Sequence, residues 1–299
     1  MILISTQCFL PVIGGLENLM SGLVDSLAKE GHEVIVFADG KYNKSDELHN
    51  FKIIRFNVWK PIRRIQKARA IKKYIKNNNI KCLFADSWKS IEYLNIKNRL
   101  DVYTLAHGSE ILKVEKNLNF FYSIKRKIKL RRIKMSFKNS NMIIANSNYT
   151  KDIIINNISV ESKKIKIIFP GIAINLNKLN KIKYPTFNTA DYNPVLITLA
   201  RLEERKGHTL VLDAIKKLLS DYPNLLYLIA GEGPFKKVIQ KKVELLGLEK
   251  NVKFLGWISE PEKSYYLKKS KIFIMTPYQV KESVEGFGMS YIDAAIQGV

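Results

Sequence analysis

The segment Val284–Asp293 has the clearest chemical potential in the chain. It reads VEGFGMSYID, so two glycines flank an aromatic residue in a loop that runs into a helical pattern. Backbone N–H groups of such a loop can hold a sugar or a phosphate, and the carboxylates of Glu285 and Asp293 can accept hydrogen bonds from hydroxyl groups. Asp293 has an alternative interpretation, because Ser290-x-x-Asp293 resembles a capping box at a helix start. The pattern offers Glu285 no such structural duty.

Two cations form a second candidate site. Arg201 and Lys206 follow the apolar run Val195–Ala200, which is typical of a buried strand. Ligands of parallel α/β sheets bind beyond the carboxyl ends of the strands. Two cations at that position can neutralise a diphosphate, and arginine can do so with two hydrogen bonds. A solvated basic loop is the simpler interpretation, and taken alone it is the commoner one.

The N-terminal half holds two further candidates. His107 follows an apolar run at Val102–Ala106, and Gly14 and Gly15 join the first apolar run to the first helical pattern. Paired glycines let a backbone approach a ligand closely, and a helix start offers N–H groups to an anion. The simpler interpretations are a satisfied turn histidine and a tight turn. The glycines form neither GxGxxG nor a P-loop, so a dinucleotide or ATP site is not indicated.

The residues around these motifs predict alternating strands and helices. Ile2–Ile4 and Val34–Ala38 are continuous apolar runs, as strands covered on both faces require. Between them, apolar residues from Leu16 to Leu27 recur at three and four positions, which places them on one face of a helix. Gly31 stands where a left-handed cap would end that helix. Strand, helix and strand in this order predict a parallel sheet.

The same alternation continues to the end of the chain. Further strands are predicted at Cys82–Ala85, Val102–Ala106, Met142–Ala145, Ile165–Phe169, Val195–Ala200, Leu225–Ala230, Val252–Leu255 and Ile272–Met275, and helices at His208–Ser220, at Phe235–Leu246, from Glu260 and from about Met289. Ser259 and Glu262 fit a capping box at the start of the helix from Glu260.

A break in this pattern suggests two domains. Residues 172–193 lose periodicity and carry prolines and turn-forming residues, which is typical of a linker. We therefore predict an α/β chain of two Rossmann-like parallel-sheet domains, at residues 1–180 and 190–299, with a ligand site in the cleft where they face each other. The pattern stops where a further strand and helix would normally follow, so we expect the second domain to be incomplete.

The order of the motifs is more specific than any one of them. Eight segments occur in one series: Gly14-Gly15, His107-Gly108, Asn146–Lys151, Phe169–Ile172, Ala200–Gly207, Ile229–Pro234, Phe254–Gly256 and Glu285–Gly288. The series closely resembles the retaining glycosyltransferases of family 4, which have the GT-B fold, and the resemblance covers essentially the whole chain. It implies that the first domain binds an acceptor and the second a nucleotide-sugar donor. The segment Val284–Ala295 looks most like members that transfer mannose or a related sugar to lipid-linked or saccharide acceptors.

The resemblance also implies a role for each matching residue. In the family, the cations matching Arg201 and Lys206 bind the donor diphosphate, and the acid matching Glu285 contacts the transferred sugar. The second acid of the E-x7-E motif contacts the ribose; here it is Asp293, one methylene shorter than the family's Glu, which puts that contact in doubt. The histidine matching His107 lies beside the donor sugar.

Backbone positions complete the implied donor site. These positions are Gly14, Gly15, Gly256, Trp257, Gly286, Phe287 and Gly288. The first two face the diphosphate or the acceptor, the next two border the base, and the last three support the sugar. The family needs no metal, and we expect no cofactor besides the nucleotide-sugar co-substrate, linked to UDP or GDP.

A strong positive charge accompanies these motifs. The chain has 50 lysines and arginines against 27 acids, a formal net charge of +23. Residues 60–81 contain no acid, and residues 113–138 hold ten cations and one acid among apolar residues. A basic helix with apolar residues can lie on an anionic membrane surface, which would suit a lipid-linked acceptor. An ordinary helix with its lysines in water is the equally weighted alternative.

Composition limits the other classes of protein. Two distant cysteines and four scattered histidines form neither a disulfide framework nor a zinc site. We see no signal peptide and no uncharged run of 18 apolar residues, so the expected location is cytoplasmic, peripheral on the inner face of the cell membrane.

Four functions remain to be weighed. The leading hypothesis is hexose transfer, of mannose, glucose or galactose type, from a UDP- or GDP-sugar with retention, in cell-surface polysaccharide or glycolipid synthesis. No residue is an evident nucleophile, so the family likeness suggests a front-face route with the diphosphate as base. One alternative is a nucleic-acid-binding protein, but we find no RRM-like, KH-like or helix-turn-helix pattern and so expect no nucleic-acid partner. The others are a nucleotide-sugar epimerase on the same scaffold and an inactive fragment.

Overall fold

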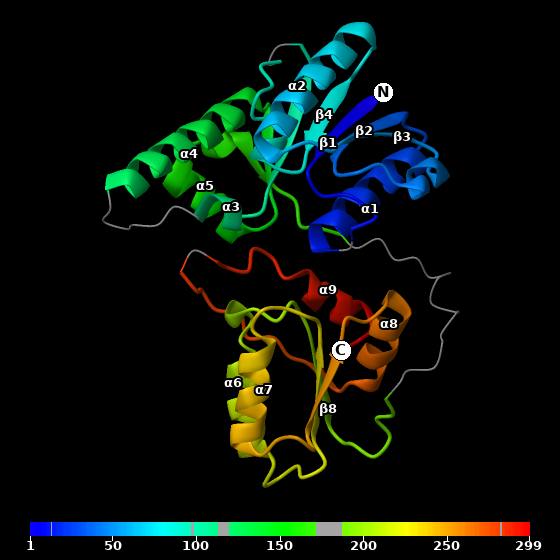
Figure 1. Cartoon of the computed structure of the whole chain (residues 1–299), viewed down its shortest axis with the longest axis vertical. Helices are drawn as coiled ribbons and strands as arrows, with labels where there is room; N and C mark the ends of the chain where they lie inside the picture. Colours follow the sequence, from blue (N-terminus) through cyan, green and yellow to red (C-terminus); the bar gives the residue numbers. More distant parts are fainter. Residues whose placement is uncertain (13, 97–98, 113–119, 172–186, 282) are drawn as a thin grey trace. The chain divides into compact units, whose positions relative to one another are not determined.

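The protein's structure, a computed structural model, describes residues 1–12, 14–96, 99–112, 120–171, 187–281 and 283–299. The chain divides into two compact units, unit 1 at Met1–Ala173 and unit 2 at Ile174–Val299 (Figure 1). This division falls within residues 172–186, which lie outside the described residues together with most of the predicted linker. The predicted boundaries at 180 and 190 therefore stay a prediction, as does the cleft between the domains.

Unit 1 is built on a seven-stranded sheet of order β3-β2-β1-β4-β5-β6-β7, in which every pairing is parallel. Its strands are β1 Ile2–Thr6, β2 Val34–Asp39, β3 Lys52–Phe56, β4 Cys82–Ala85, β5 Asp101–Ala106, β6 Met142–Ala145 and β7 Ile165–Ile167. Its helices are α1 Gly15–Lys29, α2 Lys60–Asn77, α3 Ser109–Leu112, α4 Phe120–Asn139 and α5 Asn148–Ile158, with 3₁₀ turns at Lys44–Leu48 (η1), Trp88–Ser90 (η2) and Ser162–Lys164 (η3).

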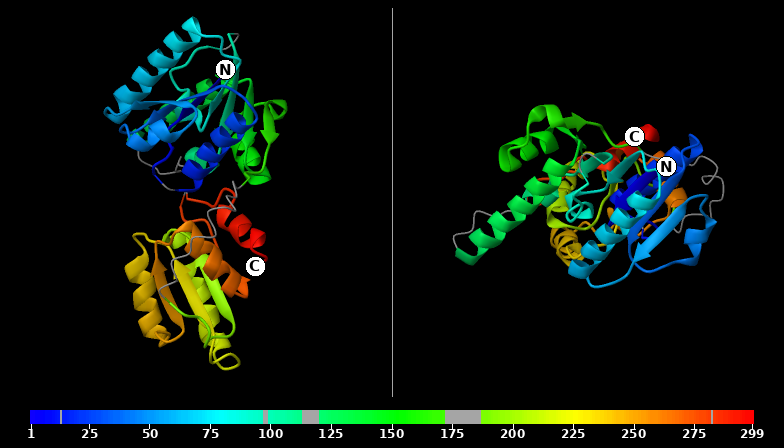
Figure 2. Two further views of the ribbon diagram at one scale, coloured as in Figure 1. Left: turned by 90° about the vertical axis from the view of Figure 1, so that its right-hand side faces the viewer. Right: turned by 90° about the horizontal axis from the view of Figure 1, so that it is seen from above.

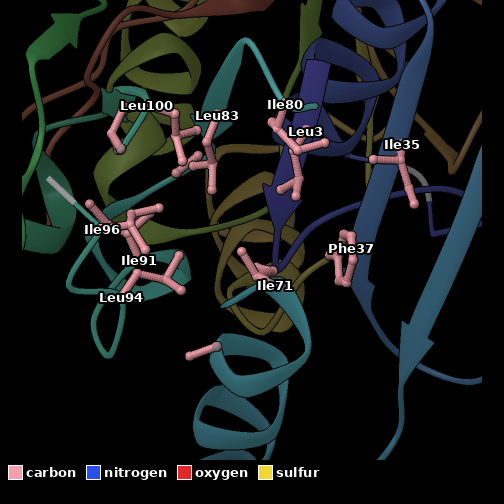
Figure 3. Packing of buried hydrophobic residues seen from close by; sticks show 13 residues of the cluster. Leu3, Ile35, Phe37, Ile71, Ile80, Leu83, Ile91, Leu94, Ile96 and Leu100 are labelled. Atoms are coloured by element: carbon pink, nitrogen blue, oxygen red, sulfur yellow. The ribbon is translucent and has the colours of Figure 1, made fainter. Parts of the chain in front are cut away.

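Alternation along the strands assigns the helices to the two faces of this sheet. Leu3 of β1 pairs in register with Ile35 and packs with Ile71 of α2 (Figure 3). Ile4, on the opposite face, packs with Met20 of α1. Figure 2 shows α1 and α2 on opposite sides of the sheet. The two apolar faces of these central strands are thus both covered, which is why their sequences are continuously apolar.

The edge of the sheet departs from the sequence-based prediction. The strand β3 was not predicted, because it lies at the sheet edge and its residues Lys52–Phe56 are exposed or half-buried rather than fully apolar. The strand predicted at Ile165–Phe169 ends at Ile167, and Phe169 is exposed. Gly31 confirms the predicted end of α1, since its φ of 80° lies in the left-handed region directly after the cap residue Glu30.

Unit 2 contains a four-stranded parallel sheet of order β10-β9-β8-β11. Its strands are β8 Val195–Leu199, β9 Leu226–Ala230, β10 Val252–Gly256 and β11 Ile272–Phe273, and its helices are α6 His208–Leu218, α7 Lys236–Leu246, α8 Glu260–Lys269 and α9 Met289–Ile296, with a 3₁₀ turn at Glu204–Lys206 (η5). Helices α6 and α7 cover one face, while α8 and α9 cover the other (Figure 1).

The predicted elements of unit 2 are all found, with small differences at their ends. The strand predicted at Ile272–Met275 stops at Phe273, because only two residues pair with β8. The capping box of α8 is confirmed: the Ser259 hydroxyl accepts from the Glu262 N–H, and the Glu262 carboxylate accepts from the Ser259 N–H at 2.9 Å. Among the described residues, no helix is both long and apolar enough to cross a membrane.

Candidate functional site

The loop after β8 brings the candidate cations of unit 2 close to the segment after β11. Gly207, at the end of η5, has φ of 75°, and a Cβ added there would overlap the carbonyl oxygen of Thr276. Only glycine permits both this backbone conformation and this close approach. The Thr276 hydroxyl also donates to the Gly207 carbonyl at 3.0 Å. The neighbouring Lys206 is therefore fixed beside the chain that leads to Glu285.

A chain of alternating charges runs through this site. Glu285 pairs with Lys206 and, at 2.9 Å, with Arg205. Arg205 also pairs with Glu203 at 3.0 Å, and Glu203 accepts from Arg201 at 3.1 Å. The structure thus places Lys206 directly against Glu285, as a shared site requires. Arg201, whose side chain is 74% exposed, is linked to Glu285 only through Glu203 and Arg205.

The charges around Glu285 determine its protonation state. Burial raises the pKa of this carboxyl, but the neighbouring Lys206 and Arg205 lower it by more, and the net pKa lies below its ordinary value. Glu285 is therefore an ionised acceptor at neutral pH. Its sequence context indicated no structural role for Glu285, and that inference was wrong. Its carboxylate is the shared partner of two cations.

Helix α9 begins immediately after the glycine loop. Gly288 precedes it with φ of 83°, and a Cβ added there would lie 2.6 Å from the Tyr291 ring. The described residues give α9 no side-chain cap, so its first backbone N–H groups remain available at the end of the segment Gly286–Gly288. Such N–H groups are suited to oxygen atoms of a phosphate or a sugar.

Asp293 occupies a different place from the one its spacing suggested. The capping-box alternative is wrong, because α9 starts at Met289 and Ser290 already lies inside the helix. The Asp293 carboxylate instead pairs with Lys263 of α8 at 2.9 Å, and Lys263 also pairs with Glu260 at 2.7 Å. A ribose contact by Asp293 stays a prediction, and a ribose hydroxyl would share this carboxylate with Lys263.

The carboxyl ends of β9 and β10 complete this edge of the sheet. Gly256 ends β10 with φ of 68°, and its carbonyl accepts from the Gly231 N–H at 2.7 Å. A Cβ added at Gly231 would overlap the Ala200 carbonyl, so glycine keeps these strand ends close together. Trp257 follows, with 62% of its surface exposed. An exposed indole ring is suited to stacking on a base.

In unit 1, His107 lies at the carboxyl end of β5. Its Nε2 is 2.9 Å from the Asp86 carbonyl oxygen, and its backbone N–H donates to the Glu110 carboxylate at 2.9 Å. A carbonyl oxygen only accepts, so Nε2 carries the proton of this hydrogen bond. The interpretation of His107 as a satisfied turn histidine is therefore supported for one ring nitrogen.

The paired glycines precede an acidic helix start. Gly14 is the residue before α1, Gly15 is its first residue, and Glu17 lies in its first turn. A Cβ added at Gly14 would overlap the Glu17 carboxylate, so this acid covers the glycine. Burial, followed by the charges of Asp86 and Glu17, raises the pKa of the Cys8 thiol in the same loop to about 12. Two carboxylates, those of Glu17 and Asp86, thus lie near this loop.

Comparison with known proteins identifies the family. The family model described as "Glycosyltransferase Family 4" matches residues 13–176, more than half of the chain, and the one described as "Glycosyl transferases group 1" matches residues 183–299. The chain belongs to glycosyltransferase family 4. The predicted resemblance is thereby confirmed.

Relatives of this family 4 chain include enzymes of lipid glycosylation. It is 24% identical to the alpha-monoglucosyldiacylglycerol synthase of Acholeplasma laidlawii, over 97% of this chain and 77% of that protein. It is 30% identical to the GDP-mannose-dependent alpha-(1-6)-phosphatidylinositol monomannoside mannosyltransferase of Mycolicibacterium smegmatis, over 36% of this chain and 28% of that protein. An uncharacterized glycosyltransferase of Methanocaldococcus jannaschii, MJ1059, is 26% identical over 56% of this chain, which spans 45% of that relative's length.

Solved structures confirm the predicted GT-B fold. HepE of Anabaena in complex with UDP has a TM-score of 0.74 at 19% identity, over 99% of this chain and 78% of that one. WaaG, a glycosyltransferase involved in lipopolysaccharide biosynthesis, has a TM-score of 0.70 at 17% identity, over 100% of this chain and 80% of that one. At these identities the likeness shows the fold alone.

The candidate site contains residues that sequence reasoning missed. Arg205 and Glu203 connect the predicted site residues, and Asp86 accepts hydrogen bonds beside His107. The signal available for Asp86 was its position directly after a strand, which it shares with His107. Within the described ranges, no three His, Cys, Asp or Glu side chains gather to hold a metal ion. The expectation of metal-free chemistry stays a prediction.

Proposed function

We propose that the chain transfers a hexose from a UDP- or GDP-sugar to a saccharide or lipid-linked acceptor, with retention of configuration. The observation that carries the proposal is the cluster of Lys206, Arg205 and Glu285 at the carboxyl end of β8, one short loop before the N-terminus of α9. A cation, an ionised acid and unused helix N–H groups supply what a sugar diphosphate needs: positive charge for its phosphates and an acceptor for its hydroxyls.

Each side chain then has a defined task. Lys206 and Arg201 hold the diphosphate and stabilise its negative charge as the sugar–phosphate bond breaks. Glu285 accepts hydrogen bonds from sugar hydroxyls. The backbone of Gly286, Phe287 and Gly288 supports the sugar, and Gly256 and Trp257 border the base.

Unit 1 serves the acceptor in this proposal. The carboxylate of Glu17 beside Gly14 disfavours a phosphate at the glycine loop, so Gly14 and Gly15 are assigned to the acceptor hydroxyls. His107 is assigned to the donor sugar. No side chain is assigned as a nucleophile, and the leaving diphosphate takes the proton from the attacking hydroxyl. The relatives that act on diacylglycerol and phosphatidylinositol glycolipids support a lipid-linked acceptor.

Thermal unfolding with a panel of nucleotides and their sugars tests this assignment. We expect UDP or GDP, and one of the sugars linked to them, to raise Tm, and we expect ADP-sugars to leave Tm unchanged. Lys206→Ala should abolish the shift. Lys242→Ala, which removes the cation of a partly exposed pair with Asp213, is the matched control and should keep it. A panel that leaves Tm unchanged, or a product that is an isomerised sugar nucleotide rather than a glycoside, would contradict the proposal.

We further propose that unit 1 docks on an anionic membrane through α2 and α4. Both helices cover the same sheet face, because Ile133 of α4 packs with Ile143, which the strand register places on the face that α2 covers. The buried Glu92 pairs with Arg64 of α2, at 2.9 Å, and with Arg132 of α4. This one acid therefore holds the two basic helices together.

The outward side of α4 is itself amphipathic. Ile133 and Phe137 point into the core, whereas Ile124, Ile128 and Met135 are 40%, 52% and 56% exposed. The three exposed residues recur on one side of the helix, and Lys127, Arg131 and Lys134, all exposed, flank them. A core-facing helix needs no second apolar stripe. Apolar residues between cations are the pattern of a helix that lies in a lipid headgroup region.

Co-sedimentation with vesicles of anionic and of zwitterionic lipid tests the docking surface. We expect binding to anionic vesicles that weakens with salt, and weaker binding after Ile128→Ser and Met135→Ser together. Leu48→Ser is the control, because Leu48 is 85% exposed in unit 1 but lies beside Asp46 and Glu47. Binding that is independent of salt and lipid charge, or that is unchanged in the Ile128→Ser, Met135→Ser variant, would exclude this surface as the docking site.

A further inference from the structure

Asp86 is a fully buried carboxylate that the transfer reaction as described does not use. It follows β4, and its side chain accepts five hydrogen bonds. Oδ2 accepts from the Thr6 hydroxyl at 3.0 Å and from the N–H groups of Gln7 and Cys8 at 2.7 and 3.3 Å. Oδ1 accepts from the hydroxyls of Ser87 at 3.2 Å and Ser90 at 2.5 Å. Among the described residues no cation pairs with it directly, so these donors compensate the buried charge.

Three of the five donors to Asp86, on Thr6, Gln7 and Cys8, come from the segment that leads into the glycine loop. Gln7 and Cys8 directly follow β1, and their chain continues to Gly14 and Gly15. The same segment is held from α2 by Lys67, which is 1% exposed and donates to the Thr6 carbonyl at 2.8 Å and to Asp39 at 2.7 Å. The path of the loop is therefore set by two buried charged groups that lie far from it in the sequence.

The backbone of Asp86 holds the second candidate group of unit 1. Its carbonyl oxygen receives the Nε2–H of His107 at 2.9 Å, which fixes the tautomer and the plane of that ring. The strands β1, β4 and β5 are consecutive in the sheet, so the residues after them meet at the edge formed by the carboxyl ends of the strands. Asp86 is the residue between the glycine loop and His107 at this edge.

We propose that Asp86 is a positioning residue, which fixes the loop after β1 through its carboxylate and His107 through its carbonyl. The inference rests on the proposed function, in which the loop receives the acceptor and His107 the donor sugar. A fully hydrogen-bonded side chain can hold both groups in one arrangement before substrate arrives. Small displacements of a positioning group reduce turnover by about 10- to 100-fold, so the effect should be measurable.

Three variants separate positioning from charge. Asp86→Ala removes the acceptors of two N–H groups, and we expect kcat to fall by about 10- to 100-fold while UDP or GDP affinity, which depends on unit 2, stays unchanged. Asp86→Asn keeps one oxygen for the loop and can donate its amide to the two serine hydroxyls, so it should restore kcat to within about threefold of the original protein. Ser140→Ala, which removes a buried hydroxyl before β6 at the opposite sheet edge, should leave kcat unchanged.

Amide hydrogen exchange gives a readout that does not depend on transfer. In Asp86→Ala the amides of Gln7 and Cys8 should exchange faster, while those of β9 in unit 2 keep their protection. If Asp86→Ala does not fold, Thr6→Val and Thr6→Ser form a second pair, and only the valine variant should show the faster exchange and lower kcat. Unchanged exchange would overturn the inference whatever the activity. An original protein without transfer activity but with this exchange pattern would refute the proposed function and keep Asp86 as the loop's anchor.

An equal loss of kcat in Asp86→Asn and Asp86→Ala, with Tm and exchange unchanged in the asparagine variant, would also overturn the inference. That result would mean that the negative charge itself acts, not the hydrogen bonds that position the loop.

Discussion

At the level of single residues, Glu285 has two cationic partners. Lys206 and Arg205 both pair with it, yet only Lys206 is assigned to the donor diphosphate. If Lys206 turns to a phosphate, Glu285 keeps one compensating cation and stays ionised in its partly buried position. Arg205, which sequence reasoning passed over, is therefore expected to matter for donor binding without touching the donor.

This expectation gives a prediction for Arg205. Arg205→Gln should weaken UDP or GDP binding by about tenfold or more, because Glu285 then competes with the phosphate for Lys206, and a hydrogen bond to a charged group contributes about 1.5–3 kcal/mol. Arg205→Lys should retain most of the affinity. Isothermal titration checks both variants. Equal affinities for the glutamine variant and the original protein would show that Arg205 is only a surface partner of Glu203.

At the level of elements, two glycines in the same backbone conformation have different surroundings. Gly207 and Gly247 have φ of 75° and 63°. A Cβ at Gly207 would overlap backbone atoms of Thr276, whereas a Cβ at Gly247 would meet nothing within 4 Å. Substituting each glycine by alanine therefore separates two free-energy costs. One is the cost of the left-handed conformation, and the other is the cost of pushing the η5 loop away from the segment after β11.

We predict that Gly247→Ala lowers the free energy of unfolding by about 1–2 kcal/mol, the cost of a left-handed conformation at a non-glycine residue. Gly207→Ala should lower it clearly more and should also weaken UDP or GDP binding, since Lys206 and Glu285 lie on the two segments that meet there. Chemical denaturation and titration measure these effects. Similar losses for the two variants, with donor binding intact, would contradict a role for this contact in building the site.

At the level of the whole molecule, the two units have separate hydrophobic cores. Leu3, Ile35 and Ile71 belong to a core of unit 1, and Leu212, Tyr227 and Ile239 to a core of unit 2. Among the described residues, only the core of unit 2 borders a buried histidine, His208, whose ring lies 3.2 Å from the Tyr227 hydroxyl. Burial and the neighbouring Lys206 charge lower the pKa of His208 to about 4.

This pKa predicts an acid-sensitive unit 2. The unfolded chain binds a proton at the ordinary pKa of 6.5, whereas the folded protein does so at about 4, so the contribution of neutral His208 to stability is full above pH 6.5 and is lost as pH falls from 6.5 to 4. Calorimetry should show an unfolding transition whose Tm is raised by UDP or GDP. This Tm should fall by about 5 °C or more as pH is lowered from 6.5 to 4. His208→Gln should flatten that dependence. A dependence unchanged by the substitution would assign it to other groups.

Local patterns in the sequence determined the elements and the positions of the candidate residues. Apolar periodicity is a property of neighbouring residues, so it placed the strands Val34–Ala38 and Val195–Ala200 within a residue of β2 and β8. The same logic located Arg201, Lys206 and His107 beyond strand ends. The edge strand β3 was not predicted, because an edge strand is not covered on both faces and does not need a continuous apolar run.

Only the tertiary structure decided which charges meet. Arg205 reaches Glu285 across 80 residues, Lys263 reaches Asp293 across 30, and Asp86 holds a loop almost 80 residues before it. Such pairs depend on the order of strands in each sheet and on the faces that the helices cover. Neither can be predicted from local periodicity. The sequence therefore determined the family and the chemical groups of this protein, and the fold determined which groups act together.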